Sequence, residues 1–523
     1  MTRQNNEDPA VPEGVRKSAR ARGVEPRGGG KRIPVNQQAG QLALFSETAE
    51  SSDAKAEEVV VEAVERPSET ATNAAPKSED KTSPATPASM EEVVSHLREA
   101  FRKIASNRGA QGPDGKSIDE VREHLDVLLP KLAAELLEGR YTPGAIRRVW
   151  LPKAGGGKRG LGIPNVIDRM IQEAVRMALE PLYEPTFHSS SHGFRPGRSC
   201  HTAIAEATEY VDEGHEWVVD LDLKSFFDRV GHQRLMSRLA QRVTDGRVLT
   251  LIGRWLKAEV VMPDGVRVST DMGVPQGGPL SPLLSNIVLD ELDRELDQRG
   301  HRFVRYADDC NIYVRSERAG KRVMASVTSF IERRLRLEVN EEKSAVARTE
   351  ERHFVGFSLR RDPLEGDVEI GLSKRSRERI DARTRELTPR NWGGSLRGCI
   401  RKLNEYLVGW FGFFQICTNQ EERTFATVDA HIRRRLRAIQ LKHWKRKRTI
   451  ARKLVQLGVK RKTAWRRVYA GRKSTWALSH DPAVDRGLRN AYFAERGLVS
   501  IAERYRRHTA QIDAPAQLTL QLG

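Results

Sequence analysis

Two adjacent carboxylates interrupt an apolar, strand-like segment in the second half of the chain. The segment FVRYADDCNIYV runs from Phe303 to Val314 and contains Asp308 and Asp309. A third acid, Asp222, lies in the hydrophobic run VVDLDL, 86 residues before Asp308. Buried carboxylates are costly unless they are paired or bind a metal ion. Asp pairs also occur in turns, where they accept backbone hydrogen bonds, but a turn explains only one of the two acidic strand ends.

The three aspartates predict a two-metal site for phosphoryl transfer. Mg²⁺ prefers oxygen ligands and keeps several waters and substrate phosphates around it. Two such ions stabilise both the attacking and the leaving oxygen of an in-line displacement. Carboxylates on adjacent strands can supply their ligands, so Asp222, Asp308 and Asp309 are candidate catalytic and metal-binding residues.

The charge of the chain indicates what such a site would act on. The 523 residues, enough for two to four domains, include 89 Lys plus Arg against 70 Asp plus Glu, a formal charge of +19. This excess favours a nucleic-acid partner over a merely soluble basic protein. The four cysteines show no C-x-x-C spacing, which argues against a zinc ribbon and fits a reducing compartment. With no apolar run of membrane length and no signal core, we expect a cytoplasmic protein without a membrane partner.

Composition and periodicity divide the chain. Residues 1–89 are rich in Ala, Glu, Ser, Thr, Pro and Gly with one aromatic side chain, and we expect them to be disordered. From Met90 a helical pattern begins, with Ser89 as its N-cap. The stretch SIDEVREHLDVLLPKLAAELLEG reads as a helix that Pro130 must kink or split. Residues 145–164 read as a β-hairpin around a glycine-rich tip.

Basic residues gather in two places. Lys153, Lys158 and Arg159 at the hairpin tip fit either a solvated turn or a flap that grips phosphates, and the residues alone leave both open. After about residue 373 the chain reads as helical and basic; residues 431–480 hold 18 Lys plus Arg, no acid, and several interleaved aromatics. A charge run is usually a solvated face, but basic side chains mixed with aromatics also suit phosphates and unpaired bases. The candidate RNA-binding residues are Arg433, Arg434, Arg435, Lys442, Lys445, Arg446, Lys447 and Arg448.

Taken together, these segments resemble the reverse transcriptases. Tyr306-Ala307-Asp308-Asp309 resembles their catalytic hairpin, and DLDLKSFFD resembles the first palm motif, with Asp222 at the metal-ligand position and Asp220 as a nearby alternative. GVPQGGPLSPLLSNIVLDELD resembles the fourth block of the family, and RLRLEVNEEKS and HFVGFSL resemble the sixth and seventh. The resemblance spans roughly residues 95–360.

The resemblance implies roles for further residues. Phe227 matches the side chain that stacks under the sugar and selects deoxynucleotides, although a core aromatic is the alternative. Gln276 matches the glutamine of the nucleotide pocket, and Lys153 and Arg159 match the residues that hold the triphosphate. Lys343 matches the lysine of the sixth block. The implied ligands are dNTPs and two Mg²⁺ ions.

Other blocks narrow the resemblance to the reverse transcriptase/maturases encoded by bacterial group II introns. NRGAQGPDG, LPKAGGGKRGLGIP and SHGFRPGRSCHTAI resemble that group, and SLRGCIRKLNEYLVGWFGFFQICT with FATVDAHIRRRLRAIQLKHWKRKRT resembles its maturase, or X, domain. The implied fold is an α+β right hand: fingers and palm with antiparallel sheet over residues 90–360, a helical thumb/maturase domain over 373–450, and a basic nucleic-acid-binding region over 451–523.

The implied function is RNA-directed DNA synthesis coupled to intron splicing. Such a protein binds group II intron RNA, assists its splicing and copies it at a primed target DNA during retrohoming. Some relatives end in an H-N-H endonuclease module with cysteine pairs, which we do not expect here. Two alternatives are a non-enzymatic RNA-folding cofactor and a reverse transcriptase recruited to another role such as phage defence. The intact acidic residues argue against the first, and the maturase-like segment argues against the second.

Overall fold

The computed structural model describes residues 88–152, 157–269, 271–418, 421–471 and 474–520. The predicted disorder of residues 1–89 therefore falls almost entirely outside the described residues, as does Lys153. None of the described helices combines the length and the apolar character needed to cross a bilayer.

The N-terminal helices begin where the sequence places their caps. Helix α2 (Met90–Ser106) starts after Ser89, whose Oγ accepts a hydrogen bond from the Glu92 amide. Helices α3 (Ile118–Glu123) and α4 (Leu125–Leu137) follow. The expected helix is split, but at His124 and not at Pro130, which lies inside α4. A capping box begins α3. Pro130 has no backbone N–H to donate, and α4 continues through it despite the loss of that hydrogen bond.

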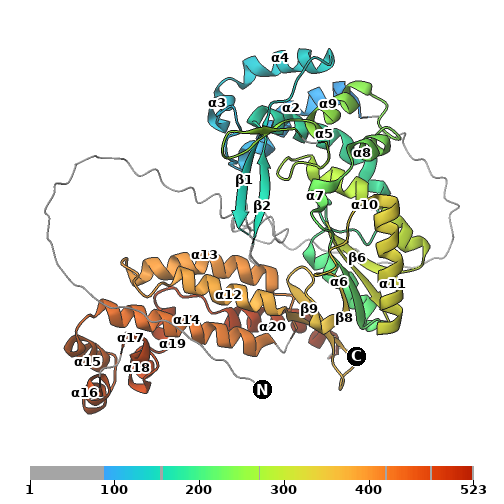
Figure 1. The fold of residues 1–523 in the computed structure, drawn as a ribbon. Coiled ribbons are helices and arrows are strands. Elements are labelled where there is room, and N and C mark those ends of the chain that lie inside the picture. The colour runs from blue at the N-terminus through green and yellow to red at the C-terminus, as the bar shows by residue number, and fades with distance from the viewer. Residues whose placement is uncertain (1–87, 153–156, 270, 419–420, 472–473, 521–523) are drawn as a thin grey trace, which may run out of the picture.

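The predicted β-hairpin is present and belongs to a small sheet. Strands β1 (Ile146–Pro152) and β2 (Lys158–Ile163) are antiparallel, and β4 (Val260–Val261) and β5 (Arg267–Val268) extend the sheet in the order β2-β1-β4-β5. The long buried helix α5 (Val166–Tyr183) packs against α2. In Figure 1 the hairpin projects away from these helices toward the C-terminal half of the chain.

A second sheet, antiparallel and four-stranded, forms the centre of the molecule. Its strands are β3 (Trp217–Leu221), β6 (Arg302–Tyr306), β7 (Asp309–Val314) and β8 (Ala345–Arg348), in the order β6-β7-β3-β8. Alternate side chains enter different cores. Val219 and Ile312 join the cluster of α10 (Ser281–Gln298) and α11 (Glu317–Phe330), whereas Val218 and Tyr313 join that of α6 (Cys200–Asp212).

Shorter elements connect these layers. They are η1 (Glu184–Thr186), α7 (Phe226–Arg229), α8 (His232–Leu239), α9 (Gly246–Leu256), η2 (Ile331–Leu335), η3 (Thr349–Glu351) and the antiparallel pair β9 (Phe357–Arg361) and β10 (Val368–Leu372).

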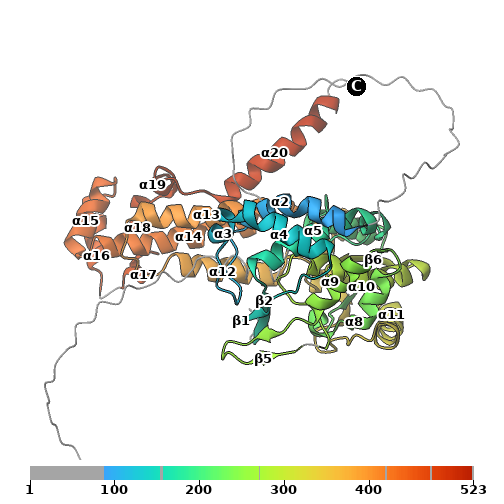
Figure 2. The same cartoon turned by 90° about the horizontal axis from the view of Figure 1, so that it is seen from above.

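The chain after β10 is helical, as predicted. Its helices are α12 (Lys374–Leu387), α13 (Leu396–Phe414), α14 (Glu422–His443), α15 (Lys447–Gln456), α16 (Arg461–Tyr469), α17 (Thr475–Leu478), α18 (Pro482–Gly487), α19 (Asn490–Ala494) and α20 (Ile501–Leu520). Both views show α12, α13 and α14 running side by side (Figures 1 and 2). Their apolar residues share one hydrophobic cluster with the α6 face of the central sheet, which includes Tyr306. His201 on α6 also lies 2.7 Å from the Phe413 carbonyl oxygen on α13. The central sheet and the helical domain are therefore joined by a common core.

Candidate active site

The two adjacent carboxylates lie at a tight hairpin turn between β6 and β7. Tyr306 pairs with Asp309, so Ala307 and Asp308 form the turn. Ala307 has φ 57°, in the left-handed region that residues with a Cβ atom rarely occupy. Such a conformation persists only where the surroundings hold it.

A buried arginine holds this turn from behind. Arg305 is fully buried, and its guanidinium donates to both carboxylate oxygens of Asp293 on α10, at 2.7 and 2.5 Å. It also donates to the Asn286 side chain at 2.9 Å, to Ser191 Oγ at 2.6 Å and to the Ala307 carbonyl at 2.9 Å. These bonds use all five guanidinium donors. Arg305 therefore ties the catalytic turn to α10 and to the loop before α6.

The register of the central sheet brings the third carboxylate to the same place. In the β3–β7 pair, Leu221 lies opposite Cys310. Continuing this register by one residue sets Asp222, at the end of β3, opposite Asp309. Asp222 and Asp308 are half-buried, whereas Asp309 is exposed. The three predicted catalytic residues thus converge at one edge of the sheet.

Loss of hydration and, after it, mutual repulsion raise the pKa values of the acids. Although the Asp309 residue is exposed in part, loss of hydration at its carboxyl group, followed by the carboxylates of Asp308, Asp220 and Asp222, raises the pKa of Asp309 to about 8. Burial also raises the pKa of Asp308, against the charge of Arg159, which lowers it. Negative charges that raise each other's pKa values form an environment that a cation stabilises.

The donor set fits Mg²⁺ better than a metal that needs a complete protein cage. In the part of the chain that is described, no three His, Cys, Asp or Glu side chains are already gathered as a finished metal site. Mg²⁺ is commonly bound by one or two carboxylates together with water and substrate phosphates. The carboxylates of Asp222, Asp308 and Asp309 suit such a partly substrate-built site.

Two of the predicted nucleotide-binding residues are bonded to each other. Arg159 on β2 donates from Nε to Gln276 Oε1 at 2.8 Å, although 117 positions separate them. The Gly162 amide also donates to the Gln276 carbonyl at 2.6 Å, so the backbones of the two segments are joined. Lys343 contacts one of the carboxylates directly, with Nζ 3.6 Å from Asp222 Oδ2. Lys343 and Arg159 therefore lie near the acidic cluster, and Gln276 is joined to it through Arg159.

Phe227 lies on α7 with 7% of its surface exposed. Its ring packs edge-on against Phe226, with centroids 5.2 Å apart, and both belong to the hydrophobic core. The Phe227 carbonyl accepts a hydrogen bond from the Val274 amide at 2.6 Å, which joins α7 to the loop that carries Gln276. Core packing is therefore observed, and a role in sugar selection stays a prediction.

Asp220, the nearby alternative ligand, has a different partner. It lies two residues before Asp222 on β3, and its carboxylate accepts hydrogen bonds from Arg352 at 2.9 and 2.5 Å. Sequence reasoning missed both Arg352 and Arg305. Arg305 had a visible signal, because its place in an apolar strand next to the acidic turn requires a buried partner.

Comparison with known proteins agrees with this geometry. Residues 151–359 match the family described as reverse transcriptase (RNA-dependent DNA polymerase), and residues 377–456 match the group II intron maturase-specific domain. The chain belongs to the group II intron reverse transcriptase/maturase family. The first match contains all three converging aspartates, Arg159, Phe227, Gln276 and Lys343.

Individual relatives match over the same region. Protein YkfC of Escherichia coli is 43% identical over 39% of this chain and 55% of its own length. The group II intron-encoded protein LtrA of Lactococcus lactis is 39% identical over 39% of this chain and 34% of its own length. The chain thus spans about half or less of these relatives. A solved "Partial Cas6-RT-Cas1--Cas2 complex" is 23% identical with a TM-score of 0.31, over 47% of this chain and 42% of that one, too distant to bear on function.

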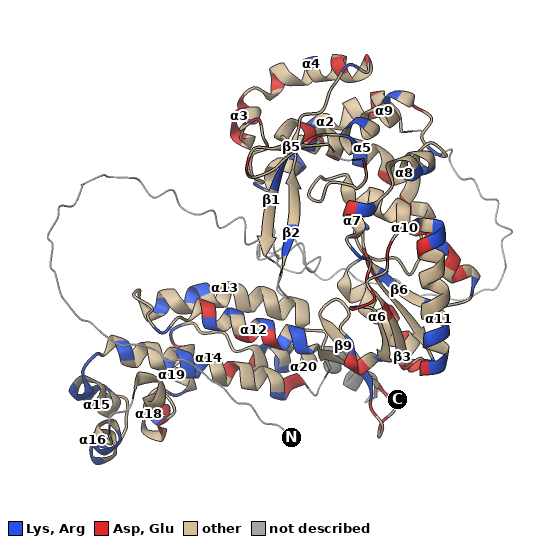
Figure 3. Cartoon of the chain, in the orientation of Figure 1, with Lys and Arg blue, Asp and Glu red and all other residues tan. Residues whose placement is uncertain are grey.

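The basic residues predicted to contact RNA all lie within the maturase-specific match. Lys442, Lys445, Arg446 and Arg448 are exposed, and Arg433, Arg434 and Lys447 are half-buried. Figure 3 shows basic residues along α14 and α15. The prediction that Arg435 contacts RNA is wrong. Only 7% of Arg435 is exposed, and its guanidinium donates to Thr388 Oγ1 and to the carbonyls of Thr388 and Arg385. Because these bonds use its guanidinium inside the domain, Arg435 is not a surface contact for RNA.

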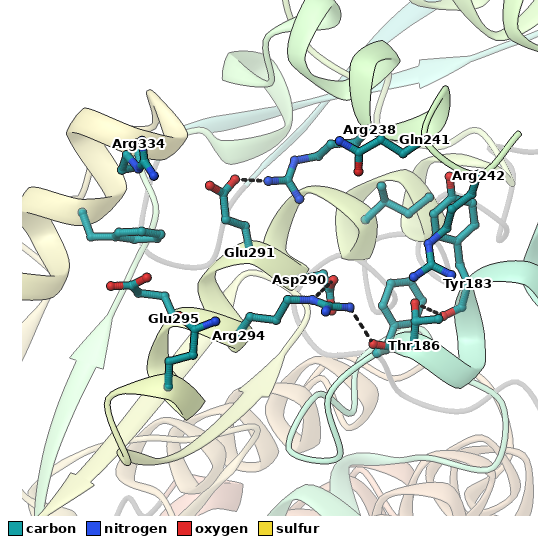
Figure 4. A pocket seen from close by; sticks show the side chains of 14 residues that line it. Tyr183, Thr186, Arg238, Gln241, Arg242, Asp290, Glu291, Arg294, Glu295 and Arg334 are labelled. Carbon is teal, nitrogen blue, oxygen red and sulfur yellow. Dashed lines mark hydrogen bonds and ion pairs between the residues drawn. The ribbon is translucent and has the colours of Figure 1, made fainter.

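A separate pocket of about 360 Å³ lies between α5, α8, α10 and α11 (Figure 4). It contains none of the predicted site residues. Two of its four arginines are bonded within the pocket wall: Arg238 to Glu291, and Arg294 to Asp290 and to the Thr186 carbonyl. We assign it no part in the chemistry.

Proposed function

We propose that the protein is an RNA-directed DNA polymerase and a group II intron maturase. The observation that supports this most directly is the convergence of Asp222, Asp308 and Asp309 at the ends of two paired strands. These carboxylates would hold two Mg²⁺ ions together with the phosphates of the substrates. Mg²⁺, when bound, supplies electrostatic stabilisation of the oxygens that attack and leave during nucleotidyl transfer.

The residues around the acids suit nucleotide binding. Arg159 supplies a fixed positive charge near Asp308, and its bond to Gln276 orients its guanidinium. Lys153 and Arg159 would bind the triphosphate, and Lys343 contacts Asp222. Phe227 would lie under the deoxyribose and exclude a 2′-hydroxyl. The substrates are then dNTPs, a primer and a template RNA.

The helical domain suits a large RNA partner. Its exposed basic residues would neutralise phosphates of the intron RNA, and its common core with the central sheet would couple RNA binding to the polymerase. The partners proposed for this chain are its intron RNA and the DNA target site, in a bacterial cytoplasm. The relative LtrA is itself named a group II intron-encoded protein.

Primer extension on an RNA template with Mg²⁺ and dNTPs tests the polymerase. We expect DNA synthesis by the wild type and none by Asp308→Asn, which keeps the size of the side chain but removes its charge. Asp212→Asn, on the exposed side of α6, is the matched control and should keep full activity. Synthesis by Asp308→Asn at the wild-type rate would overturn the two-metal assignment.

A splicing assay tests the maturase function separately. Arg446→Ala with Lys447→Ala should weaken binding of intron RNA and slow protein-assisted splicing, because two phosphate contacts are lost. Asp308→Asn should still assist splicing, since its basic surface is intact. Splicing that does not depend on the wild-type protein would remove the maturase assignment and leave the polymerase.

A further inference from the structure

A cluster of arginines around one tryptophan lies on the helical domain, away from the acidic turn. Trp476 on α17 has two guanidinium groups over its ring: Arg434 of α14, with Cζ 4.1 Å from the ring centroid, and Arg390 of the α12–α13 loop, at 4.6 Å. Arg435 approaches the same ring at 6.0 Å. Two segments far apart in the sequence thus bring their cations to the ring of a residue on a third.

The charges in this cluster are not balanced by acids. Among the described residues, neither Arg390 nor Arg434 forms an ion pair with a carboxylate; the nearby Asp381 pairs with Arg385 at 3.1 Å. The Nε atom of Arg434 is buried without a hydrogen-bond partner. Burial, followed by the charges of Arg390 and Arg385, lowers the pKa of Arg435. Guanidinium groups that repel one another and lack acids are stabilised by an external anion.

The cluster is held in place by the fold. Arg435 donates at 2.6 and 2.7 Å to the side chain and carbonyl of Thr388, two residues before Arg390. This fixes the start of the α12–α13 loop against α14. The Trp476 ring in turn restricts the side chains of Arg390 and Arg434 by cation–π contact. Pre-oriented guanidinium groups lose less conformational entropy when they bind a ligand.

A second cation–aromatic pair continues the surface. Lys402 of α13 lies 5.6 Å from the ring centroid of Trp392, which is two residues after Arg390. Arg390 itself is exposed. The loop between α12 and α13 therefore contributes one basic and one aromatic side chain, Arg390 and Trp392, and Arg390 contacts Trp476 of the acid-free stretch of residues 431–480.

We propose that Arg390 and Arg434, stacked on Trp476, form a binding site for backbone phosphates of RNA. This rests on the proposed maturase function and specifies where the helical domain grips its RNA. A phosphate is favoured because the planar guanidinium donates two parallel hydrogen bonds to its oxygens. RNA is favoured over an acidic protein because the surrounding surface joins cations to aromatic rings, which suits phosphates and bases together.

Binding of a fluorescein-labelled stem–loop RNA, measured by anisotropy across a range of salt concentrations, tests this site. Arg390→Ala with Arg434→Ala should weaken binding by about tenfold or more at low salt, and reduce the slope of log affinity against log salt by about 2. Arg390→Ala alone, at an exposed loop position, should give about half of the change in slope. Trp476→Phe should keep the slope close to that of the wild type, because all cations remain.

Matched controls distinguish a specific binding site from a general effect of positive charge. Arg318→Ala with Arg322→Ala removes the same charge from exposed positions on α11, and we expect a smaller change in slope. An equal loss in this control, or a wild-type slope in Arg390→Ala with Arg434→Ala, would overturn the site. Arg390→Lys with Arg434→Lys should keep the wild-type slope of log affinity against log salt but not the full affinity, because a lysine cannot donate two parallel hydrogen bonds to a phosphate.

Primer extension on poly(rA) with oligo(dT) keeps the two proposals apart. At saturating primer–template, Arg390→Ala with Arg434→Ala should keep the kcat of the wild type because the acidic turn is unchanged, whereas the concentration of primer–template that gives half the maximal rate should rise because RNA is bound less tightly. An inactive wild type would remove the polymerase assignment while the anisotropy series still decides the phosphate site. An active polymerase with unaltered RNA binding in the variants would remove the phosphate site alone.

Discussion

Replacing Asp293 by asparagine should destabilise the protein strongly, although Asp293 is not a predicted catalytic residue. Asp293 and Arg305 both have fully buried side chains and are bonded to each other twice. Burial lowers the pKa of Arg305, but the Asp293 carboxylate outweighs it and the net shift is upward, so the guanidinium stays charged. Asp293→Asn keeps the shape of the side chain and leaves that charge without a counterion.

The size of the effect follows from the burial. Breaking a buried ion pair by neutralising one partner costs about 3–5 kcal/mol. Arg305→Met should cost at least as much, because it strands the Asp293 carboxylate and also orphans Asn286, Ser191 and the Ala307 carbonyl. Arg305→Met with Asp293→Leu removes both charges. It should lower the free energy of unfolding less than Arg305→Met alone does. A cost of about 1–3 kcal/mol should remain, because neutral polar groups are left unpaired.

Urea denaturation of the wild type, Asp293→Asn, Asp293→Leu, Arg305→Met and the double variant Arg305→Met with Asp293→Leu measures these free energies. The expected result is strong non-additivity, with the double variant more stable than Arg305→Met. Without urea, at a temperature at which Asp293→Asn remains folded, the rate of primer extension by this variant should also be lower than that of the wild type. The reason is that Arg305 holds the turn that carries Asp308. A cost below about 1 kcal/mol for Asp293→Asn, or additive costs, would refute the buried-pair reasoning.

Three further predictions concern the same half of the molecule. A Cβ atom on Gly193 would lie 2.2 Å from the Ala307 amide nitrogen, so Gly193→Ala should shift the catalytic turn and slow primer extension by about 100-fold, whereas Gly246→Ala, with open space around it, should not. Phe227→Ala should raise the ratio of ribonucleotide to deoxynucleotide incorporation; an unchanged ratio would leave Phe227 a packing residue only. Burial, followed by the charges of neighbouring arginines, lowers the pKa of His353 to about 4. Because the unfolded chain binds the proton first, folding stability should fall as pH drops from about 6.5 to 4, and a His353→Gln variant should lose this part of the pH dependence, as urea midpoints across that range would reveal.

Local patterns in the sequence were sufficient for the elements that carry the site. The strand, turn and strand around Asp308, the basic hairpin and the helix from Ser281 all follow from alternation, glycine and proline positions and capping residues, which act over a few neighbouring positions. The misplaced break at Pro130 shows the limit of such rules, because a proline constrains one turn of a helix but does not decide where packing ends it.

Contacts between distant residues were decided only by the tertiary structure. The register that sets Asp222 opposite Asp309, the bond between Arg159 and Gln276, and the network around Arg305 each join segments that no local pattern relates. Arg435 makes the same point in reverse: in the sequence it is one of a run of arginines, and only the position of Thr388 shows that it is buried. Residue type and spacing determine which chemistry is available. The burial of a side chain and its bonding partners depend instead on how the helices and strands pack. That packing therefore decides whether a charged side chain faces the active site or is paired inside the core.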